Sequence, residues 1–260
     1  MGPGPAKLWP EVAPQWILNL PEWLEEFCFD IYKCFIYDDR YKMFITGLGN
    51  TLLLTFLALL MGVVLGVVVA LIRATWDKNG AEMHGTSKSI LRIANSICNV
   101  YLTVIRGTPV VVQLLIWYFV VFASSRNGMM IAAFAFGINS GAYVAEIIRS
   151  GIMAVDPGQM EAGRSLGFGY VATMRHIILP QAFKAVLPTL ANEFIVLLKE
   201  TAVAGYVSVS DLTYAGNIVG GNSYEYLLPL LLTALIYLAM VMFFTYLVRK
   251  LERRLRNSER

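Results

Sequence analysis

Five stretches of mostly apolar sequence, separated by short polar segments, dominate the hydrophobic pattern of this chain. The first stretch, from Phe44 to Ile72, contains no charged residue. At a rise of 1.5 Å per residue, about 20 helical residues cross the hydrocarbon core of a bilayer, so this stretch is long enough to form a transmembrane helix. The pattern predicts four further spans, over approximately residues 97–123, 129–148, 186–209 and 227–248.

Composition agrees with a membrane location. Of the 260 residues, 57% are hydrophobic and 15% are charged, and the mean hydropathy is +0.59. A soluble domain of ordinary composition has more charge and less apolar sequence. The net charge of +3 gives no indication of nucleic-acid binding. We therefore expect an all-α integral membrane protein with about five transmembrane helices.

The connecting segments differ in basic charge, and Lys and Arg favour the cytoplasmic side of a membrane. Residues 73–97 hold four basic side chains, residues 149–184 hold four and residues 249–260 hold six. By contrast, Arg126 is the one basic residue between the second and third spans, and residues 211–226 contain none. This asymmetry predicts an N-terminus outside and a C-terminus in the cytoplasm.

The region before the first span, residues 1–43, carries four basic and seven acidic side chains and has no continuous apolar core. It therefore lacks the pattern of a cleaved signal peptide. Between Trp16 and Phe35, apolar residues recur at helical spacing, interrupted by Pro21. This fits a helix that lies in the outer interface of the membrane, or one packed on the external ends of the spans. The expected division is an extracytoplasmic segment 1–43, a transmembrane domain 44–250 and a basic cytoplasmic tail 251–260.

A polar, helix-forming segment, residues 156–180, separates the third and fourth spans. Asp156 suits a helix N-cap, Pro157 suits the first helical position, and Gln159 completes a capping box. Such defined ends are typical of a surface that contacts another protein. The alternative is a solvated loop that only joins two spans.

Glycine and proline predict where the helices of this segment end. Gly167 and Gly169 are expected to adopt left-handed conformations that end the first helix and turn the chain. A second short helix should follow and stop at Leu179-Pro180.

The spacing within this segment resembles the E-A-A loop of the permease subunits of ABC importers. The matching residues are Glu161, Ala162, Gly163, Gly167, Ile177, Leu179 and Pro180. The third position of the triplet departs from the pattern, because Gly163 replaces alanine. Glycine costs roughly 1 kcal/mol of helix propensity. It either loosens the helix or allows a partner to approach its backbone closely.

Three further motifs resemble the polar amino-acid branch of the same family, and together the four cover about residues 44–250. They are Arg106-Gly107-Thr108-Pro109, Ala142-Tyr143-Val144-Ala145-Glu146-Ile147-Ile148-Arg149 and Leu198-Lys199-Glu200-Thr201. The resemblance implies a type I importer permease in the bacterial cytoplasmic membrane. It also implies partners: a dimer of ATPase subunits that hold ATP and Mg, a second permease subunit that is either a copy of this chain or a relative, and an extracytoplasmic amino-acid-binding protein.

In the resembling family, the helix after Asp156 is a cytoplasmic coupling helix that fits a groove on the ATPase subunit and moves with it. Carried over by position, the implied contact residues are Asp156, Gly158, Gln159, Glu161, Ala162, Gly163, Arg164, Ser165, Leu166 and Gly167.

Polar residues recur on single faces of the second, third and fourth spans. A charged group inside a bilayer costs several kcal/mol unless it faces protein, water or a partner. The candidates for a substrate path are Arg106, Gln113, Asn139, Tyr143, Glu146, Asn192, Glu193, Lys199 and Glu200. Their carboxylates and cations suit the ammonium and carboxylate groups of an amino acid. Alternatively, they pair with one another or reach the membrane surface.

Proline predicts a break in the second span. Pro109 lacks an N–H, which frees the carbonyl of Ile105 four residues earlier and favours a kink there. A broken span often lines a pathway through the membrane.

The sequence contains no pattern typical of a catalytic or metal site. Residues 80–87 have the glycines of a phosphate-binding loop but Thr86 in place of its lysine. Cys28, Cys34 and Cys98 do not form a ligand array and are expected to pack. If transport is driven by ATP, the nucleotide must therefore be bound by a separate subunit. The function that the resemblance implies is ATP-driven uptake of polar amino acids by alternating access. The alternatives are a secondary carrier driven by an ion gradient, with intramembrane glutamates as relays, and a membrane anchor or signalling subunit.

Overall fold

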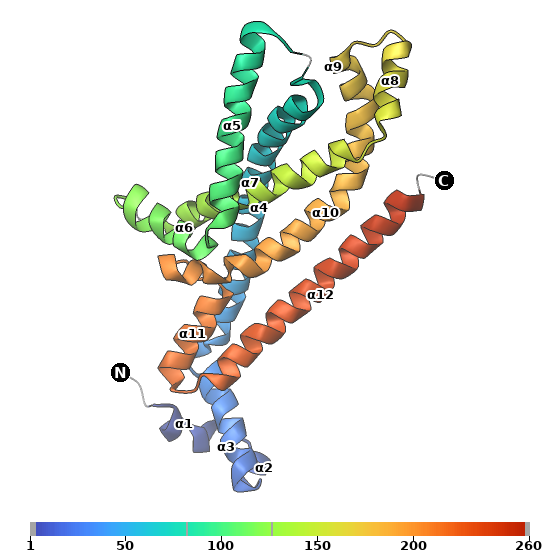
Figure 1. Ribbon diagram of the computed structural model, residues 1–260. Helices are drawn as coiled ribbons and strands as arrows, with labels where there is room; N and C mark the ends of the chain where they lie inside the picture. The colour runs from blue at the N-terminus through green and yellow to red at the C-terminus, as the bar shows by residue number, and fades with distance from the viewer. Residues whose placement is uncertain (1–3, 82, 126, 258–260) are drawn as a thin grey trace. The chain divides into compact units, whose positions relative to one another are not determined.

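A computed structural model of the protein describes residues 4–81, 83–125 and 127–257, and Figure 1 labels its helices. Over these ranges the chain is helical and forms no strand. The α-helices are α1 (Pro5–Val12), α2 (Gln15–Leu18), α3 (Glu22–Ile31), α4 (Tyr41–Asn79), α5 (Gly85–Gly107), α6 (Val110–Ile116), α7 (Gly128–Met153), α8 (Pro157–Ser165), α9 (Tyr170–Thr173), α10 (Leu179–Glu200), α11 (Leu212–Ser223) and α12 (Leu227–Asn257). Arg126 and Arg260, which contribute to the charge asymmetry of the sequence, lie outside the described residues.

Helices long and apolar enough to cross a bilayer occur at the positions of the predicted spans. Within the described residues, four of them are continuous, over 41–79, 128–153, 170–207 and 227–255. A fifth span is broken, because α5 and the helix over residues 110–121 meet at an angle of 108°. The all-α membrane fold with about five spans is thus confirmed, the fifth being counted when the bent pair is taken as one span. The first span begins and ends outside its predicted range, because helix-forming residues continue past the apolar stretch at both ends.

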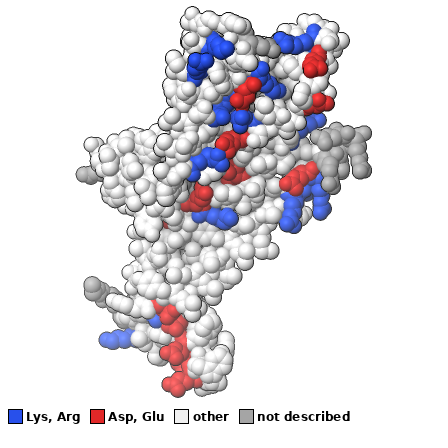
Figure 2. All heavy atoms as spheres, in the orientation of Figure 1, with Lys and Arg blue, Asp and Glu red and all other residues white. Residues whose placement is uncertain are grey.

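The N-terminal helical pattern is divided at Pro21. Helix α2 ends at Leu18, and Pro21 occupies the N-cap of α3, where its missing N–H leaves no helical hydrogen bond unmade. Trp16 and Trp23 are 66% and 69% exposed. Acidic side chains gather over α3 on the face shown in Figure 2. The segment therefore presents both apolar and acidic side chains at its surface.

The chain forms two compact units. The first is built from residues up to 52 together with 202–240, and the second from 53–201 together with the residues from 241 onward.

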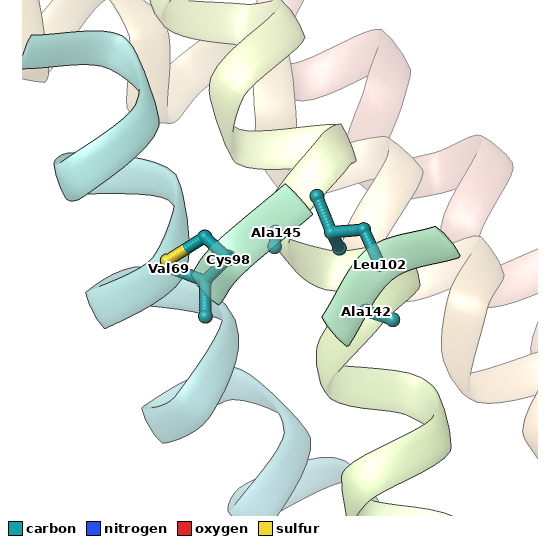
Figure 3. Packing of buried hydrophobic residues seen from close by; sticks show 5 residues of the cluster. All are labelled: Val69, Cys98, Leu102, Ala142 and Ala145. Atoms are coloured by element: carbon teal, nitrogen blue, oxygen red, sulfur yellow. The ribbon is translucent and has the colours of Figure 1, made fainter. Parts of the chain in front are cut away.

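In the second unit, α4, α5 and α7 meet around a small apolar core (Figure 3). Val69, Cys98, Leu102, Ala142 and Ala145 are all buried there. The two alanines of α7 leave room for α4 and α5 to approach closely, which is how helices associate in a membrane that offers no hydrophobic drive between them. Cys98 packs in this core, as predicted.

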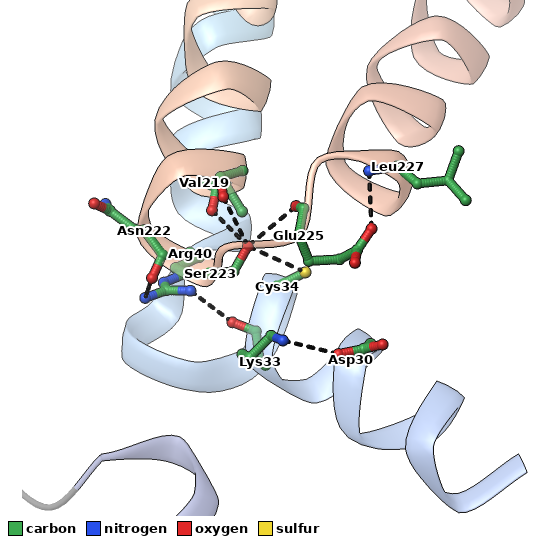
Figure 4. Close-up of polar contacts among 10 residues, drawn as sticks. Asp30, Lys33, Cys34, Arg40, Val219, Asn222, Ser223, Glu225 and Leu227 are labelled. Carbon is green, nitrogen blue, oxygen red and sulfur yellow. Dashed lines mark hydrogen bonds and ion pairs between the residues drawn. The ribbon is translucent and has the colours of Figure 1, made fainter. Parts of the chain in front are cut away.

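In the first unit, the turn after α3 is fastened to the end of α11 (Figure 4). The buried Cys34 thiol donates a hydrogen bond to Ser223 Oγ at 3.6 Å, and burial raises the pKa of this thiol. The guanidinium of Arg40 donates to the carbonyl of Lys33 at 2.8 Å and to that of Asn222 at 3.4 Å. Cys34 is therefore a packing residue, as predicted.

Candidate functional site

Helix α8 begins at the predicted residue. The carboxylate of Asp156 accepts a hydrogen bond from the Gly158 N–H at 2.8 Å, and Pro157 is the first helical residue. The predicted capping box is wrong, because the side chain of Gln159 is used elsewhere. Its amide oxygen accepts a hydrogen bond of 3.4 Å from Gln181 Nε2, which ties α8 to α10.

The end of α8 is closed by one of the two predicted glycines. Gly167 has a φ of +84°, and its N–H bonds the carbonyl of Arg164 at 3.0 Å. The N–H of Phe168 bonds the carbonyl of Gly163 at 3.1 Å, and this pair of bonds is a Schellman motif. The prediction for Gly169 is wrong: its φ of −68° and ψ of 163° are extended, because this residue is the N-cap of α9.

The predicted stop at Leu179-Pro180 is also wrong, since residues 170–207 form one helical run. Residues 174–178 form a π-helical turn, in which the N–H of Leu179 bonds the carbonyl of Met174. Pro180 then lies in the first turn of α10, where a missing N–H is tolerated.

Nine of the ten coupling candidates are exposed, and Gly163 is buried. A Cβ atom at Gly163 would lie 2.5 Å from Thr173 Cγ2 and 3.1 Å from Ile177 Cδ1. The glycine therefore lets α8 approach the helical turns of residues 170–178 within the chain itself. The exposed side of α8 ends in Leu166, which is 77% exposed.

Cavities of about 410, 500 and 450 Å³ follow one another along α7 in the second unit. The first lies between α4, α5 and α7, the second between α5, α7 and α10, and the third between α7, α10 and the start of α8. Neighbouring cavities share lining residues: Arg106 and Glu146 line the first two, and Gly151 and Ala185 the last two. The third cavity reaches Asp156, the cap of α8.

An ion pair stands where the first two cavities meet. Arg106 Nη1 of α5 pairs with Glu146 Oε1 of α7, and the guanidinium lies over the ring of Tyr143, 5.4 Å from its centroid. The structure therefore brings three predicted path residues together. Both charged side chains are more than one third exposed, so the cavities reach them.

Gln113 and Asn139 hold the break between α5 and α6. As predicted, the span bends at Pro109, and the carbonyl that the proline leaves free is satisfied by a side chain. Gln113 Nε2 donates to the carbonyl of Ile105 at 2.7 Å and to Thr108 Oγ1 at 2.8 Å. Asn139 Nδ2 donates to Gln113 Oε1 at 3.2 Å. These two candidates thus support the wall of the cavities.

Glu193 of α10 lines the second cavity and is 8% exposed. Its carboxylate accepts a hydrogen bond from Ser140 Oγ of α7 at 3.1 Å. The other candidates on α10 do not line the three cavities along α7; they are Asn192, Lys199 and Glu200.

Sequence reasoning missed several residues of this region. Arg73 lines the first cavity and donates a hydrogen bond to Asn99, yet its position after the first apolar stretch placed it in a loop. Because α4 continues to Asn79, Arg73 stays on the helix. Ser140 and Thr189 are small and neutral, so hydropathy gives no signal for them.

Comparisons with known proteins agree with this architecture. Residues 83–257 match the family described as binding-protein-dependent transport system inner membrane component. The arginine transport system permease protein ArtQ of Bacillus subtilis (strain 168) is 35% identical over 216 residues, covering 82% of this chain and 92% of that protein.

Two kinds of solved structure are similar. One, described as an amino acid ABC transporter with histidines, has a TM-score of 0.73 at 42% identity, covering 82% of this chain and 94% of that chain. The other is an inward-facing MetNI methionine ABC transporter, with a TM-score of 0.69 at 19% identity, covering 84% of this chain and 98% of that chain. At that identity the second likeness shows the fold alone.

Proposed function

Because the chain belongs to the binding-protein-dependent transport system inner membrane components, the permease subunits of ABC transporters, we propose that it carries polar amino acids into the cytoplasm by alternating access. The observation that carries this proposal is the run of cavities along α7. It connects the Arg106–Glu146 ion pair with the cap of α8.

The chemistry of the cavity walls suits a zwitterion. Arg106 offers a guanidinium for the α-carboxylate, and Glu146 a carboxylate for the α-ammonium. While the site is empty the two groups pair with each other, so neither charge is left uncompensated. A volume of about 500 Å³ is within the usual range for small-molecule sites.

Helix α8 is proposed as the coupling element. It is short, capped at both ends and exposed along the side that carries Glu161, Ala162 and Leu166. An ATPase subunit that holds ATP and Mg would bind this side of α8. The ATPase subunits form a dimer, and each of them would bind the α8 of one permease subunit. The hydrogen bond of Gln159 and the close packing at Gly163 connect α8 to the helical run of residues 170–207. A displacement of α8 by the ATPase would therefore also move the fourth span.

The proposed orientation follows the basic side chains. They gather at the C-terminal end of α12, seen in Figure 2, and this end is placed in the cytoplasm. The N-terminal segment and α11 would then face outward, where an extracytoplasmic binding protein delivers the amino acid. A second permease subunit, a copy of this chain or a relative, completes the path.

The experiment is uptake of labelled amino acids into vesicles that hold the co-purified complex, with binding protein outside. One set of vesicles encloses ATP, and another has only an imposed ion gradient. The proposal predicts uptake that needs ATP and does not follow the gradient. Uptake with the gradient alone would instead identify a secondary carrier, and the absence of any flux would favour a membrane anchor.

A pair of variants tests the coupling helix. Glu161→Ala removes an exposed carboxylate from α8, and Glu252→Ala makes the same change at an exposed position of α12. ATP-driven uptake should fall in the first variant and stay at the wild-type level in the second. Equal uptake in both variants would argue against α8 as the coupling element.

A further inference from the structure

The first cavity along α7 has a basic wall. Its charged lining residues are Arg73 of α4, Arg106 of α5 and Glu146 of α7, and the remaining lining residues are uncharged. Two cations and one carboxylate leave this wall with one positive charge in excess. On its inner side the cavity is bounded by Leu102, which belongs to the core of α4, α5 and α7 shown in Figure 3.

The excess charge is on Arg73. Arg106 and Glu146 form an ion pair with each other. Arg73 Nη1 donates a hydrogen bond to the amide oxygen of Asn99, and among the residues that the structure describes no carboxylate forms an ion pair with Arg73. Its Nε is buried and has no hydrogen-bond partner within the described part of the chain. A neutral amide orients the guanidinium but cannot neutralise it, whereas an anionic ligand would.

The uncharged polar residues of the cavity can donate to such an anion. Asn99 accepts from Arg73 through its oxygen, so its amide nitrogen is left as a donor, and Thr103 adds a hydroxyl one turn further along α5. A guanidinium binds two oxygens of a phosphate group with parallel hydrogen bonds. The volume of about 410 Å³ is in the lower part of the usual range for small-molecule sites. These donors and this volume suit a phosphate group.

The cavity lies where a lipid headgroup can reach it. Arg73 directly follows the charge-free stretch 44–72, which places it at the edge of the hydrocarbon core of the membrane. Val100 and Val104 directly follow the two donors on α5 and are 63% and 53% exposed. The polar lining therefore borders exposed apolar surface on the same helix. A phospholipid can occupy both surfaces, whereas a free phosphate ion contacts only the polar one.

We propose that this cavity binds the phosphate group of an anionic phospholipid through Arg73, Asn99 and Thr103. The headgroup of phosphatidylglycerol carries a net negative charge that compensates Arg73, whereas the ammonium of phosphatidylcholine cancels its own phosphate. This inference goes beyond the proposed function and does not depend on the substrate or direction of transport, because the three binding residues do not line the second cavity.

The test is a titration of the purified, delipidated protein, with the subunits that co-purify, followed by native mass spectrometry. The probes are phosphatidylglycerol, phosphatidylcholine and inorganic phosphate. The wild type should bind phosphatidylglycerol most tightly. Arg73→Gln should weaken that binding by at least about fivefold, the contribution of one basic side chain toward an anionic lipid, and should leave phosphatidylcholine binding unchanged.

Two further variants separate a specific site from general attraction. Arg73→Lys keeps a cation that can bind phosphate and should retain most of the preference for phosphatidylglycerol. Arg92→Gln removes the same charge from an exposed position of α5 outside the cavity and should bind both lipids as the wild type does.

Three results would overturn the inference. The first is a wild-type protein that binds the two lipids equally well. The second is an equal loss of phosphatidylglycerol binding in Arg73→Gln and Arg92→Gln, which would indicate attraction by net charge alone. The third is inorganic phosphate that displaces phosphatidylglycerol at the same concentration, which would identify a site for a free anion.

Discussion

The hydrogen bonds of Gln113 hold the break in the second span, so a substitution of Gln113 gives a direct test of how this bend is stabilised. Pro109 leaves the carbonyl of Ile105 without its helical donor, and Gln113 Nε2 replaces that donor at 2.7 Å. The amide oxygen of the same side chain accepts from Asn139 at 3.2 Å. Gln113 and Asn139 are 7% and 3% exposed, so water cannot readily take over these bonds.

The magnitude follows from the groups that Gln113→Ala leaves without a partner. Thr108 also accepts from Gln113 but is exposed, so water can replace that donor. The groups that count are the carbonyl of Ile105 and the amide N–H of Asn139. An unsatisfied polar group in a buried site costs about 1–3 kcal/mol, so the variant should lose roughly 2–6 kcal/mol of stability. Because Arg106 directly follows Ile105, the loss should also displace the ion pair of the cavity and lower uptake.

The assay is thermal and denaturant unfolding of the purified complex, followed by uptake in vesicles. Val112→Ala is the matched control, because Val112 is the preceding residue of α6 and is 47% exposed. It should cost well under 1 kcal/mol, since little apolar surface is removed from a buried site. If Gln113→Ala were as stable as Val112→Ala, the account of how the bend is held would be refuted.

Other changes have equally definite expected outcomes. Asp211 caps α11 and is fully buried, and burial raises its pKa from 3.8 to about 6, although hydrogen bonds from the N–H groups of the capped turn lower it. The native state therefore binds this proton more tightly than the unfolded state does. The stability that this gives below about pH 4 declines as the pH rises through 6. Asp211→Asn keeps a capping side chain and should remove this decline, which thermal unfolding at pH 4, 5 and 7 would measure; an unchanged slope would contradict it. A Cβ at Gly66 would lie 3.0 Å from the backbone nitrogen of Ala145 on α7, so Gly66→Leu should lower the free energy of unfolding by about 1–3 kcal/mol or more in the same assay. Gly49→Ala should not destabilise the protein, because no atom lies within 4 Å of the added Cβ. Gly167→Ala strains a left-handed residue by about 1–2 kcal/mol and should weaken ATP-driven uptake, while Gly169→Ala, at an extended position, should be tolerated; equal effects would refute the turn geometry.

Local sequence was sufficient for the spans and for the start of α8. The apolar stretches are long, and a stretch of that length that crosses a bilayer has to be helical. Asp156 and Pro157 specify a helix start through bonds within a few residues of themselves. Pro109 specified both the bend and the carbonyl that needed a new partner.

The errors occur where a residue has two compatible uses. Gly169 is compatible with a left-handed turn and with an extended N-cap, and the start of α9 decided between them. Pro180 ends a helix that precedes it but is accepted in the first turn of a new one, and the π-helical turn of residues 174–178 supplies that start.

The grouping of the polar candidates depended on tertiary packing. Glu193 and Glu200 share a helical face by spacing, yet of the two only Glu193 lines the second cavity, and it also accepts a hydrogen bond from Ser140 of α7. The sequence shows which residues share a face of one helix, but it does not show how far apart residues of different helices lie. The sequence therefore predicted which residue types lie in the spans, and the structure was needed to show which of them meet.

The central claim, that ATP drives inward movement through this subunit, is tested most directly by following labelled amino acid and ATP hydrolysis in the same vesicles. The account predicts uptake only when ATP is enclosed, with hydrolysis that rises when loaded binding protein is added outside and with both responses reduced in Glu161→Ala. Uptake that proceeds without ATP along an imposed ion gradient, and that is unchanged in Glu161→Ala, would contradict it.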